Sequence, residues 1–142
     1  MIKVRAPEEF VSYANGYKPI NLVPADVYMA GNVMYYVLTH RWLFEGHSSE
    51  GGKAAVVRGV RSTFPTEIAI SVDPYTRITI EGIKMCWTHD PKERPSARKI
   101  GDYMKNKLAR LEGVSELGIV TVKMPSLPAD HRYTDTDFYS NF

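Results

Sequence analysis

Residues 86–100 read CWTHDPKERPSARKI, and the prolines and the serine in this stretch decide how the chain folds around it. Asp90 followed by Pro91 is typical of the start of a helical turn, because proline lacks the N–H that has no partner at a first helical position. Pro95 ends this turn, since the residue before a proline avoids helical backbone angles. Ser96 then has the position and chemistry of a helix N-cap.

The segment after Ser96 has the most regular pattern in the chain. Its apolar residues are spaced three or four apart, and Gly113 is placed to end the helix. These residues are Ala97, Ile100, Met104, Leu108 and Leu111. The opposite face is basic, with Arg98, Lys99, Lys105, Lys107 and Arg110. We interpret it as a solvated face and expect no nucleic-acid partner, because no aromatic residues accompany the charges.

A second helix is predicted upstream, where apolar residues run from Val27 to Leu38. They cover every side of a helical wheel, so the pattern predicts a helix buried all round, with Pro24 as its first residue. Asp26, directly before this run, is the charged residue of the predicted helix. It either satisfies free N–H groups at the helix N-terminus or ties the helix to another loop, and the pattern favours the first interpretation.

Residues 76–87 do not decide between strand and helix from their local pattern. Ile78 and Ile80 alternate with polar residues as in a strand, whereas Ile80, Ile83 and Trp87 have helical spacing.

The remaining segments are expected to be mainly irregular. We expect a loop with one short helical turn over 1–24, a loop over 45–52, a short helix over 53–60 and irregular chain over 62–74. We expect a disordered tail over 113–142, with a weak strand signal at 118–124.

The composition places the chain among ordinary intracellular globular domains. A chain of 142 residues with a net charge of +2 suits one domain with one core. Cys86 is the single cysteine, which excludes an internal disulfide and favours a reducing, cytoplasmic location. It stands beside Trp87, and we expect a buried core thiol. We expect neither a signal peptide nor a membrane span, because the apolar stretches are too short.

Three sequence motifs occur along the chain in the order in which one protein family has them. Arg5-Ala6-Pro7-Glu8-Glu9 resembles the A-P-E motif that closes a kinase activation segment. The run that begins at Asp26 resembles the start of the family's central helix, and Arg41-Trp42-Leu43-Phe44 resembles the turn after it. Residues 86–96 resemble the Cys-Trp, Asp-Pro and Arg-Pro-Ser segment of tyrosine kinases and tyrosine-kinase-like enzymes. Residues 5–112 thus resemble the C-terminal half of the C-lobe of a protein kinase domain.

This resemblance implies a mainly α fold, a partial kinase C-lobe with helices F to I over residues 1–112 and a tail over 113–142. It implies a helix at 76–87. It also implies a buried ion pair between Glu8 and Arg94 and a structural role for Trp87. For Asp26 it favours the second interpretation, a hydrogen bond to the backbone of the family's catalytic loop.

The function implied is that of a tyrosine-kinase-like enzyme, which transfers the γ-phosphate of ATP to Ser/Thr, or Tyr, of a protein substrate. That reaction needs a Gly-rich loop, a strand Lys, and the H-R-D and D-F-G motifs. None of them occurs in these 142 residues, and the histidines are too scattered for a zinc site. We therefore expect no catalytic, cofactor or metal residues here, and ATP and Mg²⁺ only in a longer parent. The alternative is a non-catalytic, pseudokinase-like binding module with a protein partner.

In a whole kinase the central helix is partly covered by elements that precede A-P-E. We therefore expect several of Val33, Met34, Tyr36 and Val37 to form an exposed apolar strip. Such a strip predicts marginal stability, together with either self-association through the central helix or dependence on a partner.

Overall fold

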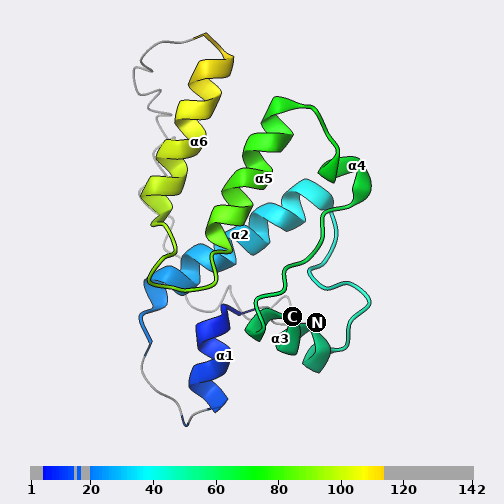
Figure 1. Cartoon of the computed structure of the whole chain (residues 1–142), viewed down its shortest axis with the longest axis vertical. Helices are drawn as coiled ribbons and strands as arrows, with labels where there is room; N and C mark the ends of the chain where they lie inside the picture. The colour runs from blue at the N-terminus through cyan, green and yellow to red at the C-terminus, as the bar shows by residue number, and fades with distance from the viewer. Residues whose placement is uncertain (1–4, 15, 17–19, 114–142) are drawn as a thin grey trace, which may run out of the picture.

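The computed structural model describes residues 5–14, 16 and 20–113. Within these residues the secondary structure is helical, without strands, which confirms the mainly α prediction (Figure 1). The helices are α1 (Pro7–Ala14), α2 (Leu22–Thr39), α3 (Ser49–Val57), α4 (Thr66–Ala69), α5 (Pro74–Cys86) and α6 (Ala97–Leu111).

Helix α2 is the element around which the others are arranged. Helix α5 crosses it and α6 packs on α5, while α1 and α3 lie together near the other end of the molecule (Figure 1). The close α2–α5 contact depends on Gly31, because a β-carbon at this position would lie 2.6 Å from Cβ of Cys86. The glycine therefore sets how near the two helices approach.

The two ends of α2 explain its length. Asn21 is the N-cap, and its side chain accepts a hydrogen bond from the N–H of Val23. The helix thus begins at Leu22, and the prediction of Pro24 as its first residue is wrong by two positions. Proline is tolerated there because the first turn of a helix has no N–H partners to lose. At the other end His40 adopts a left-handed backbone (φ 53°) and donates its N–H to the carbonyl of Tyr36.

Residues 76–87 are helical as far as Cys86, as the family resemblance implies. Asp73 caps α5 by accepting a hydrogen bond of 2.7 Å from the N–H of Thr76, and Pro74 is the first helical residue. Ile78 and Ile80 are both buried although they do not share a helix face. Because α5 lies between α2 and α6, it buries a wide arc, which produces the strand-like alternation.

Three predicted segments differ at their boundaries. Residues 1–24 contain an eight-residue helix, α1, where one short turn was expected. Glu9 accepts a 2.7 Å hydrogen bond from the N–H of Ala6, half of a capping box. Helix α3 starts at Ser49, four residues before the predicted Lys53, because Ser48 caps it. The irregular segment 62–74 contains the four-residue helix α4.

The stretch around Pro95 has the predicted form. The Asp90 carboxylate accepts a hydrogen bond from the N–H of Lys92, and its carbonyl accepts from Arg94, which closes a turn. Ser96 caps α6 by accepting from the N–H of Lys99 at 3.3 Å. Gly113 follows the helix with a left-handed backbone (φ 67°). The periodicity of this helix was sufficient to predict it from the sequence.

The predicted tail over 113–142 and its weak strand signal lie outside the described residues, apart from Gly113. The division into a kinase-like domain and a tail therefore remains a prediction. Among the residues that the structure describes, no helix is both long enough and apolar enough to cross a membrane.

Replacing Gly31 by alanine should destabilise the fold, since the new methyl group would also lie 3.0 Å from the Trp87 ring. Overpacking of this kind costs about 1–3 kcal/mol. Gly101 in α6 is the matched control, because a methyl group there meets nothing within 4 Å. Gly101→Ala should stabilise the protein by about 0.5–1 kcal/mol through helix propensity. Urea unfolding followed by circular dichroism measures both changes, and equal effects would contradict the packing described.

Cys86 should be a slow thiol in the folded protein. It is buried, and burial raises the pKa of its thiol, so little thiolate forms at neutral pH. We expect its reaction with a disulfide reagent to be at least about tenfold slower in the folded than in the urea-unfolded chain. Because the folded-state pKa is the higher one, the free energy of unfolding should fall as pH rises above about 8.5, where the unfolded thiol ionises. A fast folded-state reaction would show that the thiol is accessible.

Candidate functional site

The best-defined polar site joins the first motif of the chain to the last. Nη1 of Arg94 donates to Oε1 of Glu8 at 2.8 Å, and Nη2 donates to Oε2 at 3.1 Å. This is a two-pronged ion pair between residues 86 positions apart in the sequence. The side chain of Arg94 is 0% exposed and that of Glu8 is 12% exposed. The pair that the family resemblance implies is therefore present.

The remaining N–H groups of Arg94 are also used. Nε donates to the carbonyl of Thr88 at 2.8 Å, Nη1 to that of Pro24 at 2.6 Å, and Nη2 to that of His89 at 3.2 Å. All five guanidinium hydrogens thus have an acceptor. Since these acceptors lie on α1, α2 and the segment after α5, one side chain fixes three parts of the fold against one another.

The ring of Tyr28 in α2 lies close to two guanidinium groups. The carbon centre of Arg94 is 5.1 Å from the centroid of its ring and that of Arg61 is 5.3 Å away. Both distances are within the range of cation–π attraction. Burial raises the pKa of the Tyr28 hydroxyl, and the two positive charges act against this shift. The ring therefore remains a neutral platform for both cations.

Arg61 belongs to the same cluster, although no motif pointed to it. Nε donates to the carbonyl of Trp87 at 3.0 Å, and Nη2 lies 3.2 Å from Nδ1 of His89. Desolvation by burial lowers the pKa of Arg61. The contact connects the segment after α3 to the segment after α5.

Trp87 is a buried anchor between α2 and the end of α5. Its indole Nε1 donates to Oδ1 of Asn32 at 2.8 Å. Its ring packs against Tyr35 and Phe64, with ring centroids 5.5 Å and 6.1 Å apart. Asn32 was not singled out in the sequence. An amide within an apolar helix was the available signal, because a buried amide needs a hydrogen-bonding partner.

Asp26 lies apart from this cluster. Its side chain is exposed, and it is beyond the first turn of α2, which contains no acidic residue. Asn21 caps the helix instead, so the interpretation of Asp26 as a residue that satisfies the helix N-terminus is wrong. The alternative role, toward a catalytic loop, stays a prediction because these 142 residues contain no such motif.

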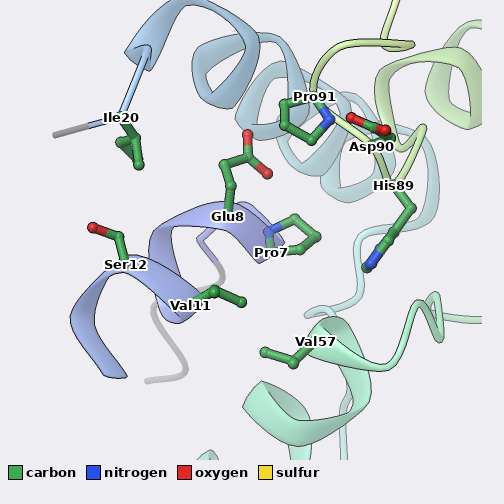
Figure 2. Close-up of a pocket in the computed structure, with 9 residues that line it drawn as sticks. All are labelled: Pro7, Glu8, Val11, Ser12, Ile20, Val57, His89, Asp90 and Pro91. Atoms are coloured by element: carbon green, nitrogen blue, oxygen red, sulfur yellow. The ribbon is translucent and has the colours of Figure 1, made fainter. Parts of the chain in front are cut away.

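A cavity of about 460 Å³ opens beside the ion pair. Figure 2 shows Pro7 and Glu8 of α1 on one side and His89, Asp90 and Pro91 on the other, with Val57 of α3 below them. Val11, Ser12 and Ile20 complete the lining. The walls are mainly apolar and carry the carboxyl groups of Glu8 and Asp90.

The face of α2 that lies opposite its buried residues carries the expected apolar strip. Val33 is 60% exposed, Val37 65% and Tyr36 41%, whereas Met34 is only partly exposed. The expectation that α2 is buried all round is therefore wrong on this face, and the expectation of an exposed strip is confirmed. In the part of the chain that the structure describes, no group of His, Cys, Asp and Glu residues could hold a metal ion.

Replacing Glu8 by glutamine should strongly destabilise the protein, because it leaves the charge of Arg94 buried without a carboxylate. The loss typical of a broken buried pair is about 3–5 kcal/mol, and the partial exposure of Glu8 favours the lower end. The control is Glu67→Gln, which breaks a 3.6 Å pair with Arg41 whose side chains are 69% and 54% exposed. Its cost should stay below about 1 kcal/mol. Urea denaturation that gives equal losses would contradict the role assigned to the buried pair.

Comparison with known proteins connects these motifs to one class of enzyme. No family model matches the chain. Two probable LIM domain-containing serine/threonine-protein kinases of Dictyostelium discoideum are each 32% identical to it over 100 residues, or 70% of this chain. Serine/threonine-protein kinase ppk13 of Schizosaccharomyces pombe is 31% identical over 77 residues, or 54% of this chain.

The chain spans only a small part of these relatives. The matched residues make up 13% and 9% of the two Dictyostelium proteins and 21% of the yeast protein. The helical architecture is consistent with part of a kinase C-lobe. Over about 100 residues, therefore, this chain is a region related to serine/threonine-protein kinases.

Proposed function

We propose that residues 5–112 are the C-terminal half of the C-lobe of a protein kinase domain of the tyrosine-kinase-like type. In this proposal α1 follows the activation segment, α2 is the central helix, and α3, α5 and α6 are the helices that complete the lobe. The proposed role of the region is to hold the end of the activation segment and to present a surface to a protein substrate. The parent reaction is transfer of the γ-phosphate of ATP to a Ser/Thr hydroxyl.

The observation that carries this proposal is the Glu8–Arg94 ion pair. It joins an A-P-E-like motif to an Arg-Pro-Ser motif through two hydrogen bonds of 2.8 and 3.1 Å. A chance match of short motifs gives no reason for such distant residues to form a buried, fully hydrogen-bonded pair. The pair is also next to the segment that would lead back to the activation segment, which suits a brace for it.

The cavity beside the pair supports a role in protein binding. Its lining includes Val11 and Ser12 of α1 and Val57 of α3. The carboxylate of Glu8 is already paired with Arg94, so the carboxylate of Asp90 is the one that favours a basic or neutral side chain over an acidic one. We accordingly assign to this region a polypeptide partner and neither a nucleic acid nor a membrane.

The 142-residue chain itself is proposed not to transfer phosphate. The Gly-rich loop, the strand Lys and the H-R-D and D-F-G motifs are the parts that position ATP and Mg²⁺, and the sequence contains none of them. A cytoplasmic location is proposed as well, on the basis of the single buried thiol of Cys86.

A chimeric kinase tests this proposal. Residues 5–112 would replace the matching segment of one of the Dictyostelium kinases, and phosphorylation of a generic protein substrate would be measured. We expect the chimera to retain activity and a Glu8→Gln chimera to lose at least about tenfold, with Glu67→Gln as the neutral control. A chimera that is folded by circular dichroism and binds ATP but is inactive would contradict the assignment.

A non-catalytic binding module is the second candidate, favoured by the exposed strip of α2. The two candidates differ in the chimera, because a module that has lost its kinase role is not required to support phosphoryl transfer. For the isolated chain both expect no rise in Tm with millimolar Mg-ATP, since ligand binding to the folded state would raise it. A clear rise in Tm would contradict the proposed lack of an ATP site.

A further inference from the structure

We infer that the cavity between the C-terminal end of α2 and the segment before α4 binds an extended segment of a partner polypeptide and takes one of its aromatic side chains. The cavity has a volume of about 670 Å³ and is lined by Tyr35, by most of the loop 41–47 and by residues 60–67. It shares no lining residue with the cavity of Figure 2. The inference goes beyond the proposed function, because it does not depend on whether a longer protein transfers phosphate.

The walls of this cavity are rich in aromatic side chains. Four of its lining residues carry aromatic rings, namely Tyr35, Trp42, Phe44 and Phe64. The ring centroids of Tyr35 and Phe64 are 5.4 Å apart, within the range of about 4.5–7 Å at which rings attract one another. Tyr35 belongs to the buried face of α2, so the cavity is not part of the exposed strip of that helix. Its volume also lies within the range of about 300–1,000 Å³ that is typical of ligand sites.

The charges around the cavity are balanced. The lining contains two arginines, Arg41 and Arg61, and two glutamates, Glu45 and Glu67. Arg41 pairs with Glu67 at 3.6 Å, and Arg61 donates to the carbonyl of Trp87 at 3.0 Å. A cavity without excess charge does not offset the cost of removing an ionised ligand group from water. The side chain that it suits is therefore neutral, and the four rings favour phenylalanine or tyrosine.

The segment before α4 offers backbone hydrogen bonds to such a ligand. Residues 60–65 form neither a helix nor a turn, and Phe64 precedes a proline, which favours an extended backbone. Within the part of the chain that the structure describes, the N–H groups of Arg61, Ser62 and Thr63 have no protein acceptor. An extended peptide pairs with unused backbone groups of this kind while its side chains enter neighbouring pockets. These N–H groups are the reason for assigning a polypeptide to the cavity.

The two segments that line the cavity are held in place before any ligand binds. The N–H of Phe44 donates to Oγ of Ser62 at 2.8 Å, and the hydroxyl of Tyr35 donates to the carbonyl of Thr63 at 2.9 Å. Phe44 is buried and has a left-handed backbone (φ 54°), which is uncommon for a bulky residue. Backbone outliers of this kind cluster at ligand sites. Because the site is already formed, binding should cost little conformational entropy.

Titration of the full chain with the capped tripeptide N-acetyl-Thr-Phe-Thr-amide tests the inference, with NMR spectra of the backbone amides as the readout. We expect a Kd in the millimolar range or tighter, with downfield shifts of the amides of Arg61, Ser62 and Thr63 as they gain an acceptor. The same peptide with alanine or glutamate in place of phenylalanine should bind at least about tenfold more weakly. Absence of shifts at millimolar peptide, shifts confined to other residues, or equal affinities of the three peptides would overturn the inference.

A pair of variants tests whether this cavity is the binding site. Trp42 is 59% exposed, so Trp42→Ala should remove one aromatic wall, leave the fold intact and weaken binding of the phenylalanine peptide at least about tenfold. Tyr75→Ala is the matched control, because Tyr75 is an aromatic residue that is 51% exposed and lies outside the cavity. It should leave the Kd unchanged. Circular dichroism checks that both variants are folded, and an equal loss of affinity in the two folded variants would overturn the inference.

Discussion

The buried guanidinium of Arg94 is the constraint on which the other contacts depend. A fully buried cation is costly unless a negative charge and hydrogen-bond acceptors surround it. Here Glu8 supplies the charge, three backbone carbonyls supply the remaining acceptors, and the ring of Tyr28 supplies one face. These groups come from three parts of the chain: α1, α2 and the segment after α5. All hydrogen bonds of the Arg94 side chain therefore form only when α1, α2 and the segment after α5 are in their folded positions.

Helix α2 carries this constraint to the rest of the molecule. Two residues on its buried face make specific contacts. Asn32 accepts a hydrogen bond from the indole N–H of Trp87, and Gly31, which has no side chain, allows α5 to approach closely. Its exposed face is apolar and has no such specific partner among the described helices. The two faces of the helix therefore differ: one is fixed by specific contacts with α5 and Trp87, and the other is exposed in the part of the chain that the structure describes.

Local signals in the sequence were enough to predict a helix where the capping residue and the apolar periodicity agree. Helix α6 follows from Ser96 and the spacing of its apolar residues, and the turn before it follows from Asp90 and Pro95. Helix α5 could not be assigned from its pattern, because two neighbouring helices bury Ile78 and Ile80 on different faces. Its strongest signal, Asp73 before Pro74, is a cap followed by a first-position proline, and it stands outside the ambiguous stretch. Helix α1 was underestimated for a related reason, since its stability depends on a partner 86 residues away.

The part of the site that could be predicted from the sequence is the ion pair, because arginine and carboxylate side chains form hydrogen bonds of known geometry. The ion pair followed from the resemblance of two motifs, and its fork geometry follows from the chemistry of arginine and carboxylate. The places of Arg61 and His89 were not predictable, because they depend on how the segments after α3 and α5 meet around Tyr28. No local pattern specifies that meeting.

Native-state hydrogen exchange tests the central claim, that Arg94 joins α1 to the segment after α5 as one structural unit. The account predicts that the helical amides of α1 and the amides of Glu93 and Arg94 open with the same free energy, to within about 0.5 kcal/mol, although they are far apart in sequence. Exchange of α1 at the rate of an unfolded chain, while Glu93 and Arg94 stay protected, would contradict it. In that case α1 would not be held by the ion pair.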